Sequence, residues 1–356
     1  MKILITGVCG FVGSTLAAAF QEQNSGITLL GIDNFIRPGS EINRLRLKRL
    51  GVQIFHGDIR LASDFEALPK ADWVIDAAAN PSVLAGIDGK SSSRQLIEHN
   101  LVGTVNLLEY CKAARAGLVM LSSSRVYSIP DLAKLQVDVR GLRFTLADGA
   151  SMPLGISSAG IREEFSTAPP ISLYGSSKLT SETLALEYSF SFGFPIWINR
   201  CGVLAGAWQM GTAQQGIFSY WVHAHASRRP LRFIGFDGYG YQVRDAFHPA
   251  DLATLVYRQM NASDRGIPRL FNVGGGASNS MSLAELSGWC DQRFGKHEVA
   301  SDPVPRPFDV PWVVMDSTPA SRCFDWQPTR CLPSILEEIA QHAEQDPDWL
   351  DTTAPA

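Results

Sequence analysis

Short apolar runs that alternate with helical patterns constrain the fold of this chain more than any other feature. The strand-like runs are Ile3–Thr6, Thr28–Ile32, Val52–His56, Trp73–Ala77 and Leu118–Ser122. Helical patterns between them cover Gly13–Gln23, Glu41–Leu50 and Ser93–Ala114. Strands that alternate with helices form βαβ units and a parallel sheet. Because the strands are almost continuously apolar, helices should cover both faces of that sheet. The pattern therefore predicts an α/β fold with a doubly wound parallel sheet.

Three glycines mark the turn between the first strand and the first helix. Gly7, Gly10 and Gly13 directly follow the strand that ends at Thr6. A phosphate needs close approach to backbone N–H groups at a helix N-terminus, and side chains at these positions would block it. The GxxGxxG spacing differs from the commonest dinucleotide fingerprint, GxGxxG. The turn, with Phe11 and Val12 inside it, predicts either a dinucleotide cradle or tight packing of the helix on the strand.

The residues that end the second, third and fourth strands favour a dinucleotide cradle over tight helix–strand packing. Asp33 ends the second strand, and a carboxylate there can accept hydrogen bonds from the ribose of adenosine and would repel a 2′-phosphate. This favours NAD over NADP, although Arg37 is close enough to neutralise a phosphate. Asp58 ends the third strand, where an adenine amino group could be met. Ala77–Ala79 ends the fourth with small side chains, against which a cofactor can lie flat. A turn residue is the alternative reading of Asp33.

A phenol and an ammonium group lie one helical turn apart in the second half of the chain. Tyr174 and Lys178 are four residues apart within the helical pattern Leu173–Ser191, and so share one face. Tyrosine is a poor base at neutral pH because its free pKa is about 10. The charge of Lys178, with that of an oxidised nicotinamide, would favour the phenolate. Tyr174 could then take a proton from a substrate hydroxyl as a hydride leaves the same carbon.

A serine run could supply a third catalytic partner. The segment Ser122–Tyr127 closes the fifth strand, at the sheet edge where α/β folds bind ligands. A hydroxyl there could hydrogen-bond the substrate oxygen and stabilise its developing charge. Each motif also has a purely structural explanation. The serine run could be an ordinary polar strand end, and the Tyr–Lys pair could lie on an ordinary amphipathic helix. The prediction of a catalytic site rests on the motifs together.

The composition narrows the class of protein. Lys and Arg total 31 against 35 Asp and Glu, a net charge of −4, which argues against a surface that coats nucleic acid. No apolar stretch approaches the length of a membrane span, and the start resembles a strand rather than a secretion signal, so we expect a cytoplasmic protein. None of the six cysteines forms a CxxC pair, so no metal site is expected.

Taken in order along the chain, these motifs resemble the extended short-chain dehydrogenase/reductase family of nucleotide-sugar epimerases and dehydratases. The resemblance runs from Met1 to about Glu344. The matching segments are Thr6–Gly13, Asp33–Asn34, Gly57–Ile59, Asn100–Thr104, Ser122–Tyr127, Tyr174 with Lys178, Arg200, Arg244–Asp245 with His248 and Asp251, and Phe271–Gly275. The resemblance implies a Rossmann-type sheet, bound NAD and a nucleotide-sugar substrate.

The resemblance also implies roles for single residues. A Ser or Thr, a Tyr and a Lys form the family's catalytic group, which here are Ser123, with Ser124 a near alternative, Tyr174 and Lys178. The resemblance adds five residues to the expected cofactor-binding set: Asn34, Ile59, Asn100, Ser122 and Arg200. On the substrate side, Arg244 and Arg306 match positions that pair with the nucleotide diphosphate. The substrate set would also include Ser124, Arg125 and Gln215.

Several features depart from the family pattern or point to one branch of it. Asp76 stands where the fourth-strand motif often has His, and no role is assigned to it. Ser124 and Arg125 follow Ser123 in place of the acidic pair of dehydratases, which disfavours a 4,6-dehydratase. The gap from Ser123 to Tyr174 is about twice the usual one. The glycine turn, the run Ser124–Ser128, Gln215–Gly216 and the run Gly240–Asp245 resemble the branch of CDP-paratose/CDP-tyvelose 2-epimerases.

This reading predicts an epimerase that transiently oxidises a sugar carbon. A UDP-sugar 4-epimerase, another nucleotide-sugar reductase or decarboxylase, and a silent NAD-binding regulatory module are the alternatives. The family resemblance further implies a homodimer whose interface comes from the helices Ser93–Ala114 and Leu173–Ser191.

The 356 residues suffice for two domains. We expect an NAD-binding Rossmann domain in residues 1–200 and 247–270, with an irregular insert at 128–170 that is either functional or a surface elaboration. A further strand is expected at Pro195–Arg200, at the end of the first segment of the Rossmann domain. Residues 201–246 and 271–346, rich in turns and ending in a helix at Leu332–Glu344, would form a smaller C-terminal α/β domain that binds the nucleotide sugar.

Overall fold

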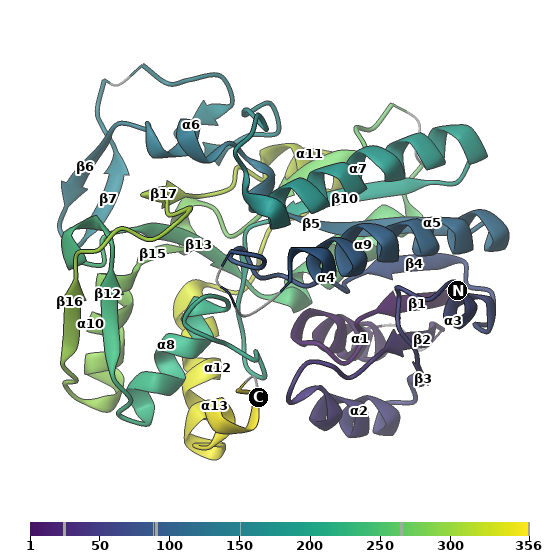
Figure 1. Ribbon diagram of the computed structural model, residues 1–356, viewed down its shortest axis with the longest axis horizontal. Helices are drawn as coiled ribbons and strands as arrows, with labels where there is room; N and C mark the ends of the chain where they lie inside the picture. The colour runs from purple at the N-terminus through teal and green to yellow at the C-terminus, as the bar shows by residue number, and fades with distance from the viewer. Residues whose placement is uncertain (24–25, 88, 90–91, 150, 264–265, 355–356) are drawn as a thin grey trace.

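A seven-stranded parallel sheet forms the centre of the N-terminal lobe (Figure 1). The computed structural model describes residues 1–23, 26–87, 89, 92–149, 151–263 and 266–354. The strand order is β14-β10-β5-β4-β1-β2-β3, and every neighbouring pair is parallel. The strands are β1 (Lys2–Thr6), β2 (Thr28–Asp33), β3 (Gln53–His56), β4 (Trp73–Asp76), β5 (Gly117–Ser123), β10 (Ile196–Cys201) and β14 (Leu270–Val273). The predicted α/β sheet is confirmed.

Helices cover both faces of this sheet, as the apolar strands require. Successive residues of β1 enter different cores: Ile3 and Ile5 pack on one face and Leu4 on the other. The first face carries α1 (Phe11–Gln23), α2 (Ser40–Arg49), α9 (Pro249–Asn261) and α11 (Thr318–Phe324). The second carries α3 (Ala62–Glu66), α5 (Gly103–Ala114) and α7 (Ser172–Phe192).

One predicted helix is interrupted, and α3 is among the helices that the sequence pattern does not predict. The pattern at Ser93–Ala114 is α4 (Ser93–Ile97), a π-helical turn at Glu98–Val102, and then α5. The extra residue of a π turn does not disturb the apolar spacing enough to be read from sequence. The segment of α3 is too short to show a helical period.

The C-terminal lobe packs helices against small sheets. Its helices are α8 (Ile217–Ala226), α10 (Leu283–Phe294), α12 (Leu332–Gln345) and α13 (Trp349–Thr352). One sheet contains β11 (Val203–Leu204), β13 (Val243–Phe247), β15 (Ser280–Ser282) and β17 (Trp312–Val313), and another pairs β12 (Leu231–Ile234) with β16 (Val299–Asp302). Short 3₁₀ turns lie at Ser124–Val126, Phe236–Gly238 and Ala277–Asn279.

The chain passes between the lobes more often than the expected division allowed. Strand β14 and helix α11 pack with the N-terminal lobe, although residues 271–346 were assigned to the second domain. Both segments bury apolar residues against the large sheet, for example Phe271 and Phe324, whose rings lie 5.2 Å apart. A boundary at residue 270 would therefore cut a strand.

The long insert is more regular than its sequence indicated. It contains α6 (Ile129–Ala133), a hairpin of β6 (Val137–Arg140) and β7 (Arg143–Leu146), and a hairpin of β8 (Ile156–Ser157) and β9 (Gly160–Ile161). Ala150 of this insert lies outside the described residues. Backbone hydrogen bonds tie it to the C-terminal lobe, from Phe144 N to Tyr241 O and from Ile161 N to Val314 O. Strands of two to four residues are too short to show alternation.

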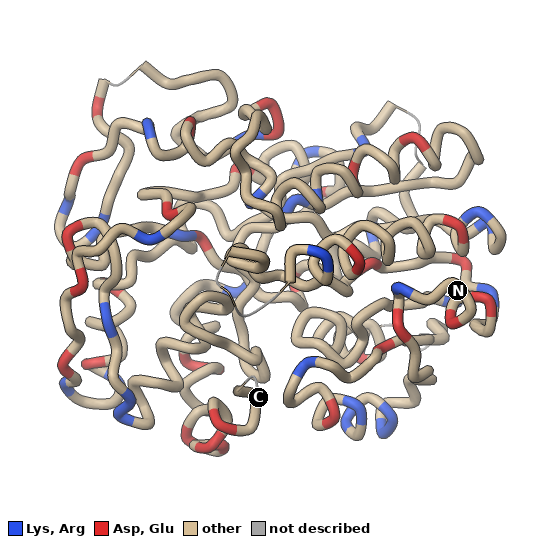
Figure 2. Tube along the Cα trace, viewed as in Figure 1, with Lys and Arg blue, Asp and Glu red and all other residues tan. Residues whose placement is uncertain are grey.

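Acidic and basic residues are interspersed over both lobes (Figure 2). Within the described ranges, no helix is long and apolar enough to cross a membrane.

Candidate active site

The glycine turn at the end of β1 is built for close backbone approach. Gly7 has a φ of +61°, and its carbonyl accepts a hydrogen bond from Gly10 N at 3.0 Å. A Cβ on Gly13 would lie 2.3 Å from Gly7 O, so no other residue fits at the first turn of α1. The backbone N–H groups that open α1 face a cavity, which is the arrangement that holds a phosphate.

Asp33 stands beside this turn at the end of β2. Its Oδ2 accepts a hydrogen bond from Cys9 N at 2.8 Å, and its Oδ1 accepts one from Phe35 N at 2.9 Å. Burial raises the pKa of Asp33, while these backbone donors act in the opposite direction. Two fixed main-chain contacts hold the carboxylate at the cavity wall, where further lone pairs remain for ligand hydroxyls.

One cavity brings together most of the predicted cofactor residues. It runs along the carboxyl edge of the large sheet, where such folds bind ligands. Its lining includes Gly7, Gly10, Phe11, Val12, Gly13, Asp33, Asn34, Ile59, Ala77, Ala78, Ala79, Ser122, Tyr174 and Lys178. An extended cradle that begins at a glycine turn and ends at a Tyr–Lys pair fits a dinucleotide.

Three predicted cofactor residues do not line this cavity. Asp58 instead pairs with Arg60, with atoms as close as 2.6 Å, and accepts a hydrogen bond from Asn34. Although burial opposes it, this pairing lowers the pKa of the Asp58 carboxyl. Asn100, in the π turn, holds the backbone of Asn80 from both sides, through Asn80 N and Asn80 O. These side chains shape the wall behind the cavity.

Arg200 is the third residue outside the cavity. It forms a buried ion pair with Glu182 of α7, with Nη2 and Oε2 2.7 Å apart. It also donates to Tyr127 Oη at 3.3 Å, and Ser122 donates from its hydroxyl to Glu182. The pair therefore fastens α7, which carries Tyr174 and Lys178, to the ends of β5 and β10.

Ser123, Tyr174 and Lys178 all line the cofactor cavity. Ser123 ends β5, and its Oγ accepts a hydrogen bond from Arg125 N at 3.1 Å. Both Ser123 and Tyr174 also line a second, adjoining cavity. The hydroxyl of Ser123 and the phenol of Tyr174 can therefore contact a substrate group held in the second cavity while a cofactor occupies the first.

Asp76, to which the sequence assigned no role, lies buried behind Lys178. Thr6 donates from its hydroxyl to Asp76 Oδ1 at 2.8 Å. Burial raises the pKa of Asp76, and the charge of Lys178 opposes that rise. The carboxyl thus contributes to the local field around the ammonium group.

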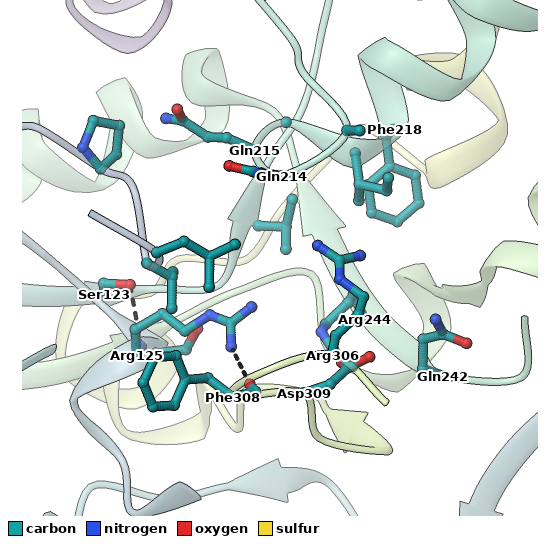
Figure 3. Close-up of a pocket in the computed structure, with 18 of the residues that line it drawn as sticks. Ser123, Arg125, Gln214, Gln215, Phe218, Gln242, Arg244, Arg306, Phe308 and Asp309 are labelled. Carbon is teal, nitrogen blue, oxygen red and sulfur yellow. Dashed lines mark hydrogen bonds and ion pairs between the residues drawn. The ribbon is translucent and has the colours of Figure 1, made fainter. Parts of the chain in front are cut away.

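The second cavity gathers all five predicted substrate residues. Ser124, Arg125, Gln215, Arg244 and Arg306 line it. In Figure 3, Ser123 lies on one side and Gln242 on the other, with the three arginines between them. Three guanidinium groups in one cavity suit a ligand with two or more negative charges.

Two of the three arginines are held in place by the segment 308–310, which precedes β17. Arg125 donates to Phe308 O at 3.3 Å (Figure 3). Arg244 donates to Asp309 Oδ1 at 3.2 Å and to Val310 O at 2.9 Å. Burial lowers the pKa of Arg244 to about 10, so the group stays charged at neutral pH. These contacts fix the orientation of its guanidinium group in the cavity wall.

Sequence reasoning missed several lining residues. Gln214, Phe218, Gln242 and Asp309 line the second cavity, and Gln209 and Met210 line the cofactor cavity. Asp309 lies in the same run as Arg306 and could have been found there. Gln209 and Met210 come from a loop of the other lobe and carry no local signal. Among the described residues, no cluster of His, Cys, Asp or Glu could hold a metal ion, and the six cysteines are unpaired.

Comparison with known proteins places these features in one family. The model of the NAD-dependent epimerase/dehydratase family matches residues 3–274. CDP-paratose 2-epimerase of Salmonella typhi is 30% identical over 92% of this chain and 95% of its own length. UDP-glucuronate 4-epimerase 3 of Arabidopsis thaliana is also 30% identical, over 96% of this chain and 76% of that protein.

A solved structure agrees over the whole length. UDP-glucuronic acid 4-epimerase from Bacillus cereus, in complex with UDP-glucuronic acid and NAD, superimposes with a TM-score of 0.78 at 25% identity. The match covers 97% of this chain and 99% of that one.

Proposed function

The chain belongs to the NAD-dependent epimerase/dehydratase family, and we propose that it inverts carbon 2 of the sugar in CDP-paratose or CDP-tyvelose. Together with the similarity to nucleotide-sugar epimerases over nearly the whole chain, this membership makes it an NAD-dependent nucleotide-sugar epimerase. The choice of sugar is supported by the similarity to the Salmonella typhi 2-epimerase, which covers nearly all of both chains. One geometric observation carries the reaction: Ser123 and Tyr174 are among the residues that line both the cofactor cavity and the arginine-lined cavity.

The cofactor cavity would hold NAD through its glycine turn and Asp33. The N–H groups at the start of α1 would bind the diphosphate, and the Asp33 carboxylate would accept hydrogen bonds from ribose hydroxyls. Bound NAD supplies a hydride acceptor and donor for the sugar carbon. Tyr174 and Lys178 line the same cavity, and Tyr174 also lines the arginine-lined cavity, so the nicotinamide would face the substrate beside this pair.

The nucleotide sugar would bind with its diphosphate among the arginines. Arg125, Arg244 and Arg306 lie between Ser123 and Gln242 (Figure 3), so the sugar would point toward Ser123 and the nucleoside toward Gln242. Tyr174 takes the proton from the hydroxyl of the carbon to be inverted, and Ser123 donates a hydrogen bond to the same oxygen. Lys178 stabilises the phenolate. The keto sugar then presents its other face, and Tyr174 returns the proton.

Proton NMR of purified protein with CDP-paratose, and no added NAD, tests this proposal. We expect signals of the C2 epimer to appear, because the cofactor is regenerated in each cycle. A Tyr174→Phe variant serves as the control, since it keeps the ring and loses the proton acceptor. An unchanged spectrum from protein shown to contain NAD would contradict the proposed substrate.

UDP-glucuronate 4-epimerisation is a second candidate. The Arabidopsis and Bacillus cereus relatives act on this sugar by name, and Arg125 could pair with a sugar carboxylate. The same NMR assay with UDP-glucuronate separates the two, because conversion of UDP-glucuronate alone would favour this candidate.

We propose further that two copies pair through α4, α5 and α7. These helices lie side by side and expose apolar side chains, among them Phe190 at 88% and Phe192 at 52% exposure. Burying such surface against a second copy would stabilise a dimer. Sedimentation velocity should give a dimer that Phe190→Glu weakens, whereas a monomeric parent protein would contradict the proposal.

A further inference from the structure

The cofactor cavity is closed on one side by a loop from the other lobe. This loop, Trp208–Met210, follows β11 and contributes Gln209 and Met210 to the cavity lining. On the opposite wall, Arg37 from the β2–α2 connection also lines the cavity and donates a hydrogen bond to Met210 O. Because Asp33 stands four residues before Arg37, the loop covers the end where the adenosine ribose would lie.

Trp208 is held by contacts on two sides. Its backbone φ is +66°, a left-handed conformation that a bulky residue adopts only when its surroundings enforce it. The Arg46 guanidinium of α2 lies 5.3 Å from its ring centroid. The ring of His342 lies 4.5 Å away and that of Trp349 5.7 Å away, both in edge-to-face geometry.

The short C-terminal helix α13 fastens this loop from behind. Trp349 is fully buried, and its Nε1 donates a hydrogen bond to Gln209 O at 2.9 Å. Four residues later, the methyl group of Thr353 packs against Gly39 at the start of α2, where a Cβ would lie only 2.7 Å from it. The same segment therefore contacts both walls of the cavity.

Among the described residues, the side chain of Gln209 makes one hydrogen bond within its own lobe and leaves one acceptor unpaired. Its Nε2 donates to Leu204 O at 2.8 Å, which fixes the amide. Its Oε1 is buried and has no hydrogen-bond partner within the described ranges. An unpaired buried acceptor carries a free-energy cost, so the other contacts of the loop must hold it in this position.

We propose that Trp208–Met210, Arg37 and Trp349 form a clasp that retains NAD between turnovers. Arg37 joins the two walls directly, and Trp349 holds the loop in its closed position. Retention suits an epimerase, since its cofactor is restored in every cycle. The inference rests on the proposed function only for the presence of NAD, and is independent of the sugar.

Two variants each remove one contact of the clasp. Arg37→Met keeps the aliphatic stem and loses the donor to Met210 O, while Trp349→Phe keeps an aromatic ring and loses the donor to Gln209 O. The measurement is the rate at which NAD leaves the holoprotein, followed by exchange with excess radiolabelled NAD. Each variant should release NAD about tenfold faster, the effect of losing one hydrogen bond.

Matched controls separate retention from general loosening. Arg228→Met removes a guanidinium that donates to Phe294 O, Gly295 O and Lys296 O, away from the cavity. Trp289→Phe makes the same ring change on α10. Both controls should exchange NAD at the parent rate. Parent-like exchange in both clasp variants, or equal acceleration in the controls, would overturn the clasp. Because the exchange assay uses no sugar, failure of the proposed substrate would leave its outcome unaffected.

Discussion

The buried ion pair behind the active site gives a prediction whose size follows from the structure. Arg200 and Glu182 are 6% and 2% exposed, and their charged groups make three hydrogen bonds of 2.7 to 3.1 Å. Glu182→Gln preserves the shape of the side chain but leaves the guanidinium without its counter-charge. Breaking a buried pair in this way costs about 3–5 kcal/mol. The contacts of Arg200 with Tyr127, a hydrogen bond and a ring 5.2 Å away, remain. Because these contacts remain, the expected loss in free energy of unfolding lies near the lower end of this range.

Urea unfolding of parent and variant measures this loss. We expect a lower free energy of unfolding with an unchanged denaturant slope, since the surface buried on folding is the same. The double variant Glu182→Leu with Arg200→Met should recover most of the loss, because no buried charge is left unpaired. It should also retain NAD, since Arg200 does not line the cofactor cavity. A loss below about 1 kcal/mol in Glu182→Gln would refute the account of this pair.

Three further predictions concern the proposed catalytic phenol of Tyr174, the proposed diphosphate site and acid stability. Tyr174→Phe should lower turnover by about 10²–10⁴-fold, the usual contribution of a general acid–base, while bound NAD stays measurable by absorbance after denaturation. Arg244→Lys should raise KM for the nucleotide sugar more than it lowers kcat, because an ammonium group cannot replace the bidentate fork; steady-state kinetics decide this. Burial, then the neighbouring His342, lowers the pKa of His223 to about 3. The stability contributed by neutral His223 is therefore present above its unfolded pKa near 6.5 and is lost as pH falls toward 3. His223→Gln should make the melting temperature fall less steeply as the pH is lowered. An equally steep fall in the variant would contradict this role of His223.

Features carried by contiguous residues could be predicted from the sequence. The glycine turn, Asp33 at the end of β2, and the Tyr174–Lys178 pair each belong to one strand end or one helix, where local geometry fixes what the side chains can do. The alternation of elements sufficed for the parallel sheet, because apolar strands need helices on both faces.

Features assembled across the two lobes could not be predicted in the same way. The convergence of Arg125, Arg244 and Arg306 was expected only from the family resemblance, since they lie on three separate segments. Glu182 was not singled out because a carboxylate within a helix normally faces solvent. Its buried partner, Arg200, was expected beside the cofactor for the same reason: sequence shows the charge but not the ion pair.

Isotope retention during epimerisation tests the central claim most directly. If the reaction oxidises and re-reduces a single sugar carbon, the hydrogen on that carbon leaves and returns without exchange with solvent. With CDP-paratose in deuterium oxide, mass spectrometry and proton NMR of the product should show the C2 epimer without deuterium at the inverted carbon. Deuterium at that carbon would show proton exchange with solvent and would contradict transient oxidation of that carbon.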